Sequence, residues 1–308
     1  MKRLIFAGRG KLVAVAALSL VFTQLSAGGA TAAAPLPAGW DLVSGAGECL
    51  AAMDNEAFTL EIGTFSDGRY AVKDSVNSAG YSLTSGNGRY YLLIVEGIDS
   101  FYAGPVDGRC EWDFFQGPKD LPSWTHMVGA GNNLVLFYNA GSGLAVTATI
   151  NANHKLIQQE TYNLSPGWTH IIGSDRADRR LVFYHSGSGL TVTGQLTTRG
   201  EFVQHQTYLG SDHPRVPGPG WTHVAGTNDG GVLFYNEADG HARSFYLKDA
   251  GVPGKLAFGG NFILASDFTH VVGAGARGLL LYRNTGFAWG GYLDEVGRWR
   301  RARIYGGS

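Results

Sequence analysis

The sequence predicts an all-β fold: a single β-propeller of four-stranded antiparallel blades, with six blades expected and five as the alternative. The main observation is a repeated motif, in which Trp-Thr-His is followed by two apolar residues and Gly. Clear copies start at Trp124, Trp168, Trp221 and, with Phe in the first place, Phe268, and degenerate copies start at Trp40 and Tyr81. The starts lie 41 to 53 residues apart, and such intervals are typical of propellers and solenoids.

The third copy shows the strand pattern within one repeat. Residues 124–128, 134–138, 144–150 and 156–162 are short runs rich in β-branched, aromatic or alternating apolar side chains. Turn residues such as Gly, Asn and Ser separate these runs, so each repeat is expected to form four antiparallel strands. The later copies repeat the pattern at 181–184, 190–196 and 202–208, at 232–235 and 242–247, and at 279–282, 287–293 and 299–305.

A ring of such sheets is favoured over an open stack. Closing the ring leaves only short strand edges, and each sheet packs its face on the next. No segment of useful length has the 3.6-residue apolar period of an amphipathic helix. Gly accounts for 46 of the 308 residues, which suits many tight turns.

The N-terminal residues 1–34 are predicted to be a signal peptide. Lys2, Arg3, Arg9 and Lys11 precede an apolar stretch at 12–25, and small residues at 30–34 offer cleavage near 32–34. The alternative is a retained membrane anchor, for which the apolar run is short. The propeller would then occupy 35–308, with blades starting near residues 40, 81, 124, 168, 221 and 268.

The net charge and the cysteine content limit which partners and which cellular compartment are expected. Removal of the four basic leader residues leaves 20 Lys and Arg against 25 Asp and Glu, a formal charge of −5. An acidic chain of this kind argues against nucleic acid as a partner. No membrane span is expected after signal removal. Cys49 and Cys110 predict one disulfide in a secreted chain, with two buried free thiols as the alternative.

The sequence contains no recognised catalytic motif, so no catalytic residue and no cofactor is predicted. Residues 273–278 fit a Gly-x-Gly-x-x-Gly pattern, but they lie between two expected strands and lack the helix that binds a phosphate. The motif histidines could converge on a metal ion near the axis. Their identical place in each repeat favours a local brace instead, and no metal is predicted. The structural signature comprises Trp124, His126, Gly129, Trp168, His170, Gly173, Trp221, His223, Gly226, Phe268, His270 and Gly273.

Ligand contacts are predicted where the second strand of each repeat ends. Variable polar residues follow a constant Tyr there, as in a binding loop held by a rigid frame. The candidates are Asn139, His185, Asn236 and Arg283 with the preceding Tyr138, Tyr184, Tyr235 and Tyr282. In the alternative interpretation, the Tyr rings fill gaps between blades and the polar residues cap hairpins.

The Trp-Thr-His motif and the apolar run ending in Phe-Tyr resemble the repeats of tachylectin-2-type and Photorhabdus-type lectin propellers and of related secreted actinobacterial lectin modules. The resemblance covers 124–308 well and 40–120 poorly. It implies a secreted, extracellular, non-catalytic lectin that binds glycans or glycoconjugates at repeated shallow sites. One alternative is a protein-interaction scaffold or the recognition subunit of a toxin assembly, with another secreted protein subunit as its partner. The other is an extracellular hydrolase with a central-channel site.

Overall fold

A computed structural model describes residues 33–306, apart from 67, 78–80, 87–89, 96–99, 106–109, 111–114, 117–123, 132, 154, 175–177, 211–215 and 249–251. The chain divides into residues 1–31 and a compact unit of residues 32–308. The predicted signal peptide therefore lies almost wholly outside the described residues. No helix in the described part is long and apolar enough to span a bilayer.

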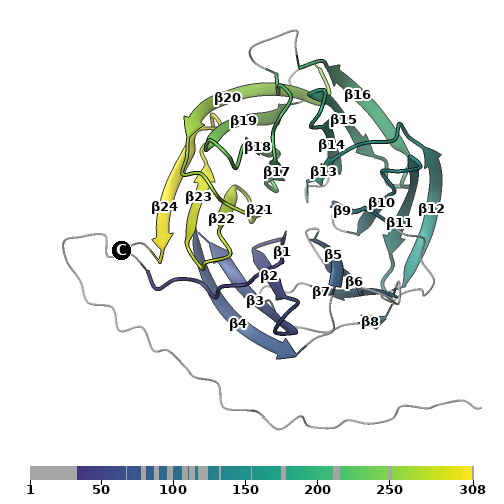
Figure 1. Ribbon diagram of the computed structural model, residues 1–308. Helices are drawn as coiled ribbons and strands as arrows, with labels where there is room; N and C mark the ends of the chain where they lie inside the picture. The colour runs from purple at the N-terminus through teal and green to yellow at the C-terminus, as the bar shows by residue number, and fades with distance from the viewer. Residues whose placement is uncertain are drawn as a thin grey trace, which may run out of the picture. The chain divides into compact units, whose positions relative to one another are not determined.

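Residues 32–308 form a ring of six four-stranded antiparallel sheets, which confirms the predicted fold class (Figure 1). Blade 1 comprises β1 (Leu42–Ala46), β2 (Cys49–Asp54), β3 (Thr59–Ser66) and β4 (Arg69–Asn77). Blade 2 comprises β5 (Tyr81–Gly86), β6 (Tyr90–Val95), β7 (Ser100–Pro105) and β8 (Phe115–Gln116). Blade 3 comprises β9 (His126–Ala130), β10 (Leu134–Tyr138), β11 (Leu144–Ile150) and β12 (Leu156–Asn163).

The remaining sheets follow the same order. Blade 4 comprises β13 (His170–Gly173), β14 (Arg180–His185), β15 (Leu190–Leu196) and β16 (Phe202–Tyr208). Blade 5 comprises β17 (His223–Gly226), β18 (Gly231–Tyr235), β19 (His241–Lys248) and β20 (Lys255–Ile263). Blade 6 comprises β21 (His270–Ala274), β22 (Gly278–Tyr282), β23 (Ala288–Leu293) and β24 (Trp299–Tyr305).

The first strand of each blade lies around the centre, and the fourth strand lies at the rim (Figure 1). We call the face with the turns between second and third strands, and with the connections between blades, the upper face. The lower face carries the other two turns of each blade. Since β21 contacts both β17 and β1, the ring is closed.

The repeated Gly of the motif allows neighbouring first strands to approach closely. A Cβ added at Gly273 would lie 1.7 Å from the carbonyl oxygen of Gly226, and one at Gly173 would lie 1.9 Å from that of Gly129. Any larger residue would push adjacent blades apart. The Gly five residues after the motif aromatic is therefore a packing requirement of the ring.

The core lies between the sheets and is richest along the second strands. Every residue of β10 and of β18 is buried. Aromatic rings of one blade pack against those of the next, as Tyr184 of blade 4 does against Phe234 of blade 5 at a centroid distance of 5.2 Å. Because one sheet cannot bury both of its apolar faces alone, the blades stabilise one another.

The two ends of the described chain meet at blade 6. Ala33 bridges to Tyr305, and the N–H of Leu36 donates to the carbonyl of Gly286 at 2.9 Å. The N–H of Leu164 makes the same bond to Gly143 in the connection between blades 3 and 4. The N-terminal segment thus supplies the connection from blade 6 to blade 1 that the end of the chain lacks.

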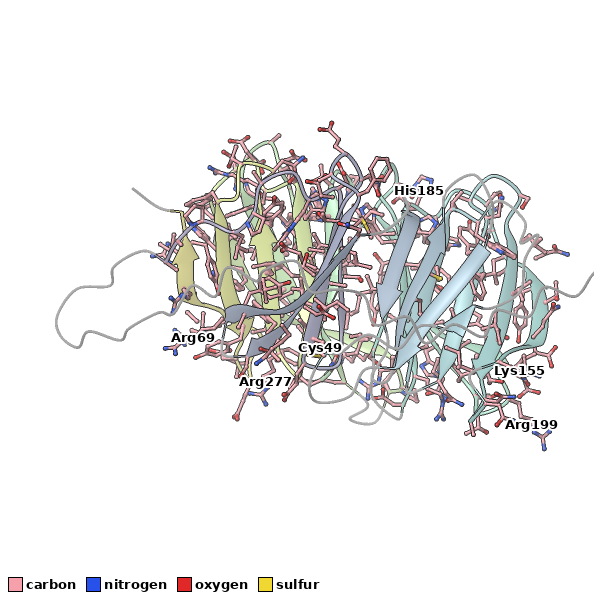
Figure 2. All side chains as sticks on the ribbon, turned by 90° about the horizontal axis from the view of Figure 1, so that it is seen from below. Cys49, Arg69, Lys155, His185, Arg199 and Arg277 are labelled. Atoms are coloured by element: carbon pink, nitrogen blue, oxygen red, sulfur yellow. A yellow bond between two sulfur atoms is a disulfide. The ribbon has the colours of Figure 1, made fainter. Side chains whose placement is uncertain are left out.

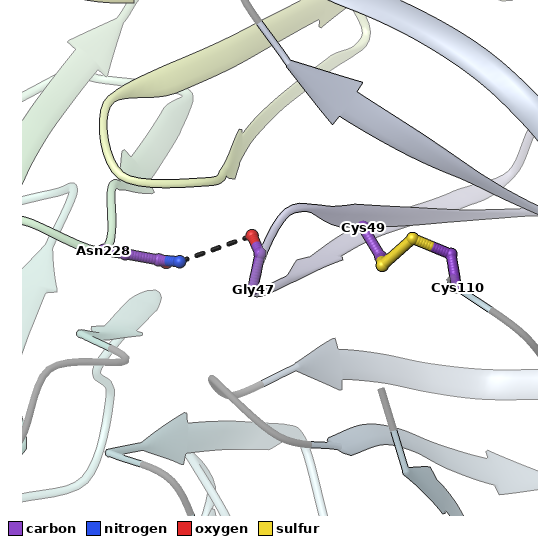
Figure 3. Close-up of a disulfide and its surroundings, with 4 residues drawn as sticks. All are labelled: Gly47, Cys49, Cys110 and Asn228. Atoms are coloured by element: carbon purple, nitrogen blue, oxygen red, sulfur yellow. Dashed lines mark hydrogen bonds between the residues drawn. A yellow bond between two sulfur atoms is a disulfide. The ribbon is translucent and has the colours of Figure 1, made fainter. Parts of the chain in front are cut away.

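The predicted disulfide is confirmed. Cys49 of β2 is bonded to Cys110, in the segment after β7, so that the bond joins blades 1 and 2 (Figure 3). Neither residue is exposed to solvent. The disulfide strengthens the part of the ring in which the sequence motif is most degenerate.

Candidate functional site

A groove of about 570 Å³ opens on the upper face at blade 5. One wall is the connection from blade 4, ending at Trp221, and the other is formed by the turn after β18 and the ends of β19 and β20. The polar residues of the lining are Asn236, Asp239, His241, Arg243 and Asn261.

The set of charges in this groove distinguishes blade 5 from blades 3 and 4. The strand register places Ser142, Leu144 and Val146 of blade 3, and Ser188, Leu190 and Val192 of blade 4, at the positions of Asp239, His241 and Arg243. Where blades 3 and 4 have a hydroxyl and two apolar side chains, blade 5 has a carboxylate, an imidazole and a guanidinium. Blade 1 has Thr59 and the carboxylate of Glu61 at the positions of His241 and Arg243. Since the frame is otherwise repeated, these substitutions are a local departure from it.

Asp239 and His241 form a pair at the mouth of the groove. Nδ1 of His241 lies 3.0 Å from Oδ2 of Asp239, and the backbone N–H of His241 donates to Oδ1 at 2.9 Å. This backbone hydrogen bond lowers the pKa of Asp239 and keeps the carboxylate ionised. The carboxylate contacts Nδ1 of the imidazole, and the His241 side chain is 59% exposed.

Arg243 lies two residues further along β19, on the same side of the strand as His241. Its guanidinium stacks over the ring of Trp221 at 5.5 Å, and Nη1 donates to the carbonyl of Val216 at 3.3 Å. Stacking and one hydrogen bond hold the group in place without neutralising its charge. Nε1 of Trp221, which is buried, has no hydrogen-bond partner among the described residues.

The four predicted Tyr candidates lie in the framework rather than in the groove. The side chains of Tyr138, Tyr184, Tyr235 and Tyr282 are all fully buried. In each case the hydroxyl accepts the N–H of the next motif aromatic and donates to a nearby carbonyl. For Tyr184, the partners are the N–H of Trp221 at 3.2 Å and the carbonyl of Gly218 at 2.9 Å. Both hydrogen-bonding roles of each hydroxyl are thus taken within the protein, in line with the alternative interpretation that the Tyr rings fill the gaps between blades.

The predicted polar candidates mostly cap the turns that follow the Tyr residues. Oδ1 of Asn139 accepts the N–H of Ser142 at 2.9 Å, and Nδ1 of His185 accepts the N–H of Ser188 at 3.1 Å. Arg283 bonds the carbonyl of Ser266 and stacks on Phe287. Of these four candidates, Asn236 lines the groove.

The motif histidines link adjacent blades. Nε2 of His170 lies 2.9 Å from the carbonyl oxygen of Thr222 in the next blade, and Nδ1 lies 3.0 Å from Oγ1 of Thr169. A carbonyl can only accept, so Nε2 carries the proton, and the hydroxyl of Thr169 donates to the carbonyl of Tyr184 at 3.0 Å. His126, His223 and His270 make the same contacts. Burial lowers the pKa of His170, so the neutral ring is favoured.

Two acids among the described residues of the lower turns are paired with arginines. Asp229 is buried and bonds Nε of Arg277 at 2.7 Å. Nδ2 of Asn228 donates to the carbonyl of Gly47 at 3.3 Å, which connects the first turns of blades 5 and 1 (Figure 3). No three His, Cys, Asp or Glu side chains lie close enough to share a metal ion within the described ranges.

The sequence analysis missed His241 and Arg243 because it considered only the residues that the repeats have in common. Aligning the copies by their Tyr-turn segment and asking where one copy departs would have found both residues. A charged residue at a position that is apolar in sister repeats is the signal that the sequence offered.

Comparisons with known proteins support the fold of this chain but reveal little similarity in sequence. No protein-family model matches this chain, and no curated protein sequence matches it. The periplasmic gluconolactonase of Pseudomonas aeruginosa is similar in structure, with a TM-score of 0.51 and 16% identity over 85% of this chain and 84% of that chain. A putative 6-phosphogluconolactonase from Bacteroides uniformis has a TM-score of 0.51 and 14% identity over 82% of this chain and 80% of that one.

A third similar structure is Prp20p of Saccharomyces cerevisiae, described with its binding to Gsp1p and histones, with a TM-score of 0.51 and 11% identity over 85% of this chain and 75% of that chain. These likenesses confirm the propeller fold, and no family match supports the narrower resemblance to lectin propellers. The predictions of a non-catalytic lectin and of a chain that is not an enzyme are corrected on these comparisons, since two of the similar propellers are named as lactonases.

Proposed function

We propose that this chain is a hydrolase that opens cyclic esters, of the lactone class, in the groove of blade 5. The observation that carries the proposal is the replacement of the repeated Ser, Leu and Val by Asp239, His241 and Arg243 in one blade. The resulting set contains an oriented imidazole and a fixed cation beside an open groove. The lactonase names of the similar propellers support the choice of reaction.

His241 is the general base in this mechanism. Its Nδ1–H is held by Asp239, so that Nε2 accepts a proton from a water molecule as the water oxygen attacks the lactone carbonyl. The proton then passes from His241 to the ring oxygen as the C–O bond of the tetrahedral intermediate breaks. Water is consumed, the ring opens to a hydroxy acid, and the imidazole returns to its neutral form.

Arg243 stabilises the oxygen that becomes negative during the attack. The Cα atoms of residues 241 and 243 are about 6.5 Å apart along a strand, which leaves room for a carbonyl group between the two side chains. The guanidinium is oriented in advance by Trp221 and Val216, so little reorganisation is needed when charge develops. Asn236 and Asn261 supply hydrogen bonds for a polar substrate ring.

We also place the chain outside the cytoplasm, with secretion into the medium as the specific form of that location. The disulfide supports an oxidising compartment, and the leader-like N-terminal sequence supports export. Mass determination of the protein recovered from culture medium tests both. Recovery only from the cytoplasm, with an intact leader and two free thiols, would contradict this placement.

The reaction is tested by following acid release from a panel of aldonolactones with a pH-stat. The protein should accelerate opening, and His241→Gln should lower kcat/KM by roughly 10²–10⁴-fold. Arg243→Gln should lower it by roughly 10²–10³-fold, mainly through kcat. His185→Gln is the matched control, since it removes an upper-face imidazole from blade 4 that caps a turn and pairs with no carboxylate.

Two results would overturn the proposal. One is the absence of catalysis on every lactone by a folded protein with an intact disulfide. The other is activity that His241→Gln and His185→Gln reduce equally, because the reaction would then not depend on the groove.

A further inference from the structure

An exposed aliphatic side chain lies in the groove of blade 5, next to the charged residues. Ile263, the last residue of β20, lines the groove and is 69% exposed. It is the most exposed of the large apolar side chains in the part of the chain that the structure describes. The groove lies on the upper face, which is the side of the ring that carries His185 in Figure 2. Ligand sites combine apolar walls with a few polar groups, and Ile263 supplies exposed apolar surface to this one.

The strand register places Ile263 beside the imidazole. Ile263 lies directly opposite His241 in the ladder between β19 and β20, and Asn261 lies opposite Arg243. Residues that are opposite in an antiparallel pair project to the same side of the sheet, with Cβ atoms about 4.5–5.5 Å apart. The four side chains therefore form one group on the groove side of blade 5. Within this group, the outer strand contributes the aliphatic chain and the amide.

The aliphatic residue is a departure from the repeat, as the charged residues are. At the position of Ile263, blade 1 has Asn77 and blade 3 has Asn163. Blade 4 has an exposed aliphatic residue, Leu209, directly after β16, but it lacks the imidazole and the guanidinium. Among blades 1, 3, 4 and 5, blade 5 is thus the one that places an exposed aliphatic side chain beside an imidazole.

The reaction proposed for the groove determines which part of a substrate lies near Ile263. His241 gives its proton to the ring oxygen of the lactone, so the ring carbon bonded to that oxygen lies on the side of His241. A substituent on this carbon therefore meets Ile263, the cross-strand neighbour of His241. A substituent on the carbon next to the carbonyl lies instead on the side of Arg243 and Asn261, which offer it a charge and an amide.

We propose that Ile263 forms a subsite for an aliphatic chain carried by the lactone on the carbon that bears the ring oxygen. The substrate class is then the cyclic esters of hydroxy fatty acids. Ile263 covers one side of the chain, and the other side stays in water because the groove is open. This inference rests on the proposed function and adds a substrate class to it.

The test compares γ-lactones that carry unbranched methyl, propyl and pentyl chains, in the pH-stat assay. The value of kcat/KM should rise roughly twofold for each added methylene, because full burial gives roughly fourfold and one side of the chain remains in water. The gain should appear in KM, since the chain is bound equally in the ground state and the transition state. The matched substrate is the isomer with the pentyl chain on the carbon next to the carbonyl. It has the same apolar surface and should gain much less.

A pair of variants tests the residue itself. Ile263→Ser should lower the ratio of kcat/KM between the pentyl and methyl lactones by roughly 3–10-fold, as expected for loss of one-sided contact with an aliphatic side chain. Leu209→Ser is the matched control. It removes a side chain that is 55% exposed at the corresponding end of blade 4, and the ratio should stay as in the parent.

Binding of the corresponding γ-lactams separates this inference from the reaction. A lactam keeps the ring and its carbonyl but is not opened in the assay, so saturation-transfer NMR reports binding alone. The pentyl lactam should bind more tightly than the unsubstituted one, and Ile263→Ser should reduce this advantage while Leu209→Ser retains it. The same result without opening of any lactone would support the subsite and contradict the proposed reaction.

Three results would overturn the inference. The first is a chain that raises neither the affinity of the lactam nor kcat/KM. The second is an equal gain for the two positional isomers, because the chain would then bind without regard to the side of His241. The third is an equal loss in the Ile263 and Leu209 variants.

Discussion

Removal of one buried hydroxyl, in Tyr184→Phe, tests the interpretation of the Tyr residues as blade connectors. The hydroxyl donates to the carbonyl of Gly218 at 2.9 Å and accepts the N–H of Trp221 at 3.2 Å. The ring is fully buried, and burial raises the pKa of Tyr184 to about 12, so the hydroxyl remains a donor at neutral pH. Both partners belong to the connection between blades 4 and 5.

The expected loss follows from the groups that the substitution leaves unpaired. A buried donor or acceptor without a partner costs about 1–3 kcal/mol. The Trp221 N–H is buried and bears the full cost, whereas the Gly218 carbonyl is half-buried and regains water in part. We expect Tyr184→Phe to lower the free energy of unfolding by about 2–4 kcal/mol. For a chain of this size, the melting temperature should fall by roughly 5–12 °C.

Urea unfolding followed by intrinsic fluorescence measures this loss. Tyr292→Phe is the control, since that ring is 40% exposed and should change stability by less than about 0.5 kcal/mol. A loss below about 0.5 kcal/mol for Tyr184→Phe would refute the reasoning. It would mean that the hydroxyl is dispensable to the connection and is free for another role.

Three further predictions concern the ring. Gly273→Ala should lower the free energy of unfolding in urea by about 3 kcal/mol or more, because the added Cβ would overlap the neighbouring first strand. In the control Gly218→Ala, the added Cβ meets nothing within 4 Å, and the loss should be far smaller. Equal losses in the two variants would contradict the packing argument. Loss of the disulfide in Cys49→Ser with Cys110→Ser should cost about 4 kcal/mol, given a separation of 61 residues, and an unchanged melting temperature would contradict it. The pKa of His170 is lowered mainly by burial, so the unfolded chain binds more protons, and stability should fall as pH drops below about 6.5. A melting temperature that rises as the pH falls below about 6.5 would contradict this prediction.

Local patterns in the sequence were enough for the strands and the type of fold. Runs such as 134–138 and 144–150 alternate or are uniformly apolar, and the structure has β10 and β11 at those positions. The structural importance of the motif Gly at 273 was also evident from the sequence, since every repeat has Gly at this position. These features depend on side-chain period and turn chemistry, which act over a few residues.

The candidate site could not be obtained in the same way. Tyr184 and His185 are adjacent in sequence, yet one is a buried connector and the other caps an exposed turn. His241 and Arg243 become a site only because the connection ending at Trp221 lies across from them. A search for residues shared by all repeats overlooks residues that differ in only one repeat.

By itself, the sequence determined that the chain forms short strands in repeated four-stranded units and that two cysteines suit an oxidising compartment. The tertiary structure alone decided that the ring closes through the segment from Ala33 to Trp40 and that the open groove lies at blade 5. The physical reason is range: strand formation depends on neighbours along the chain, whereas ring closure and the groove depend on residues brought together from different blades.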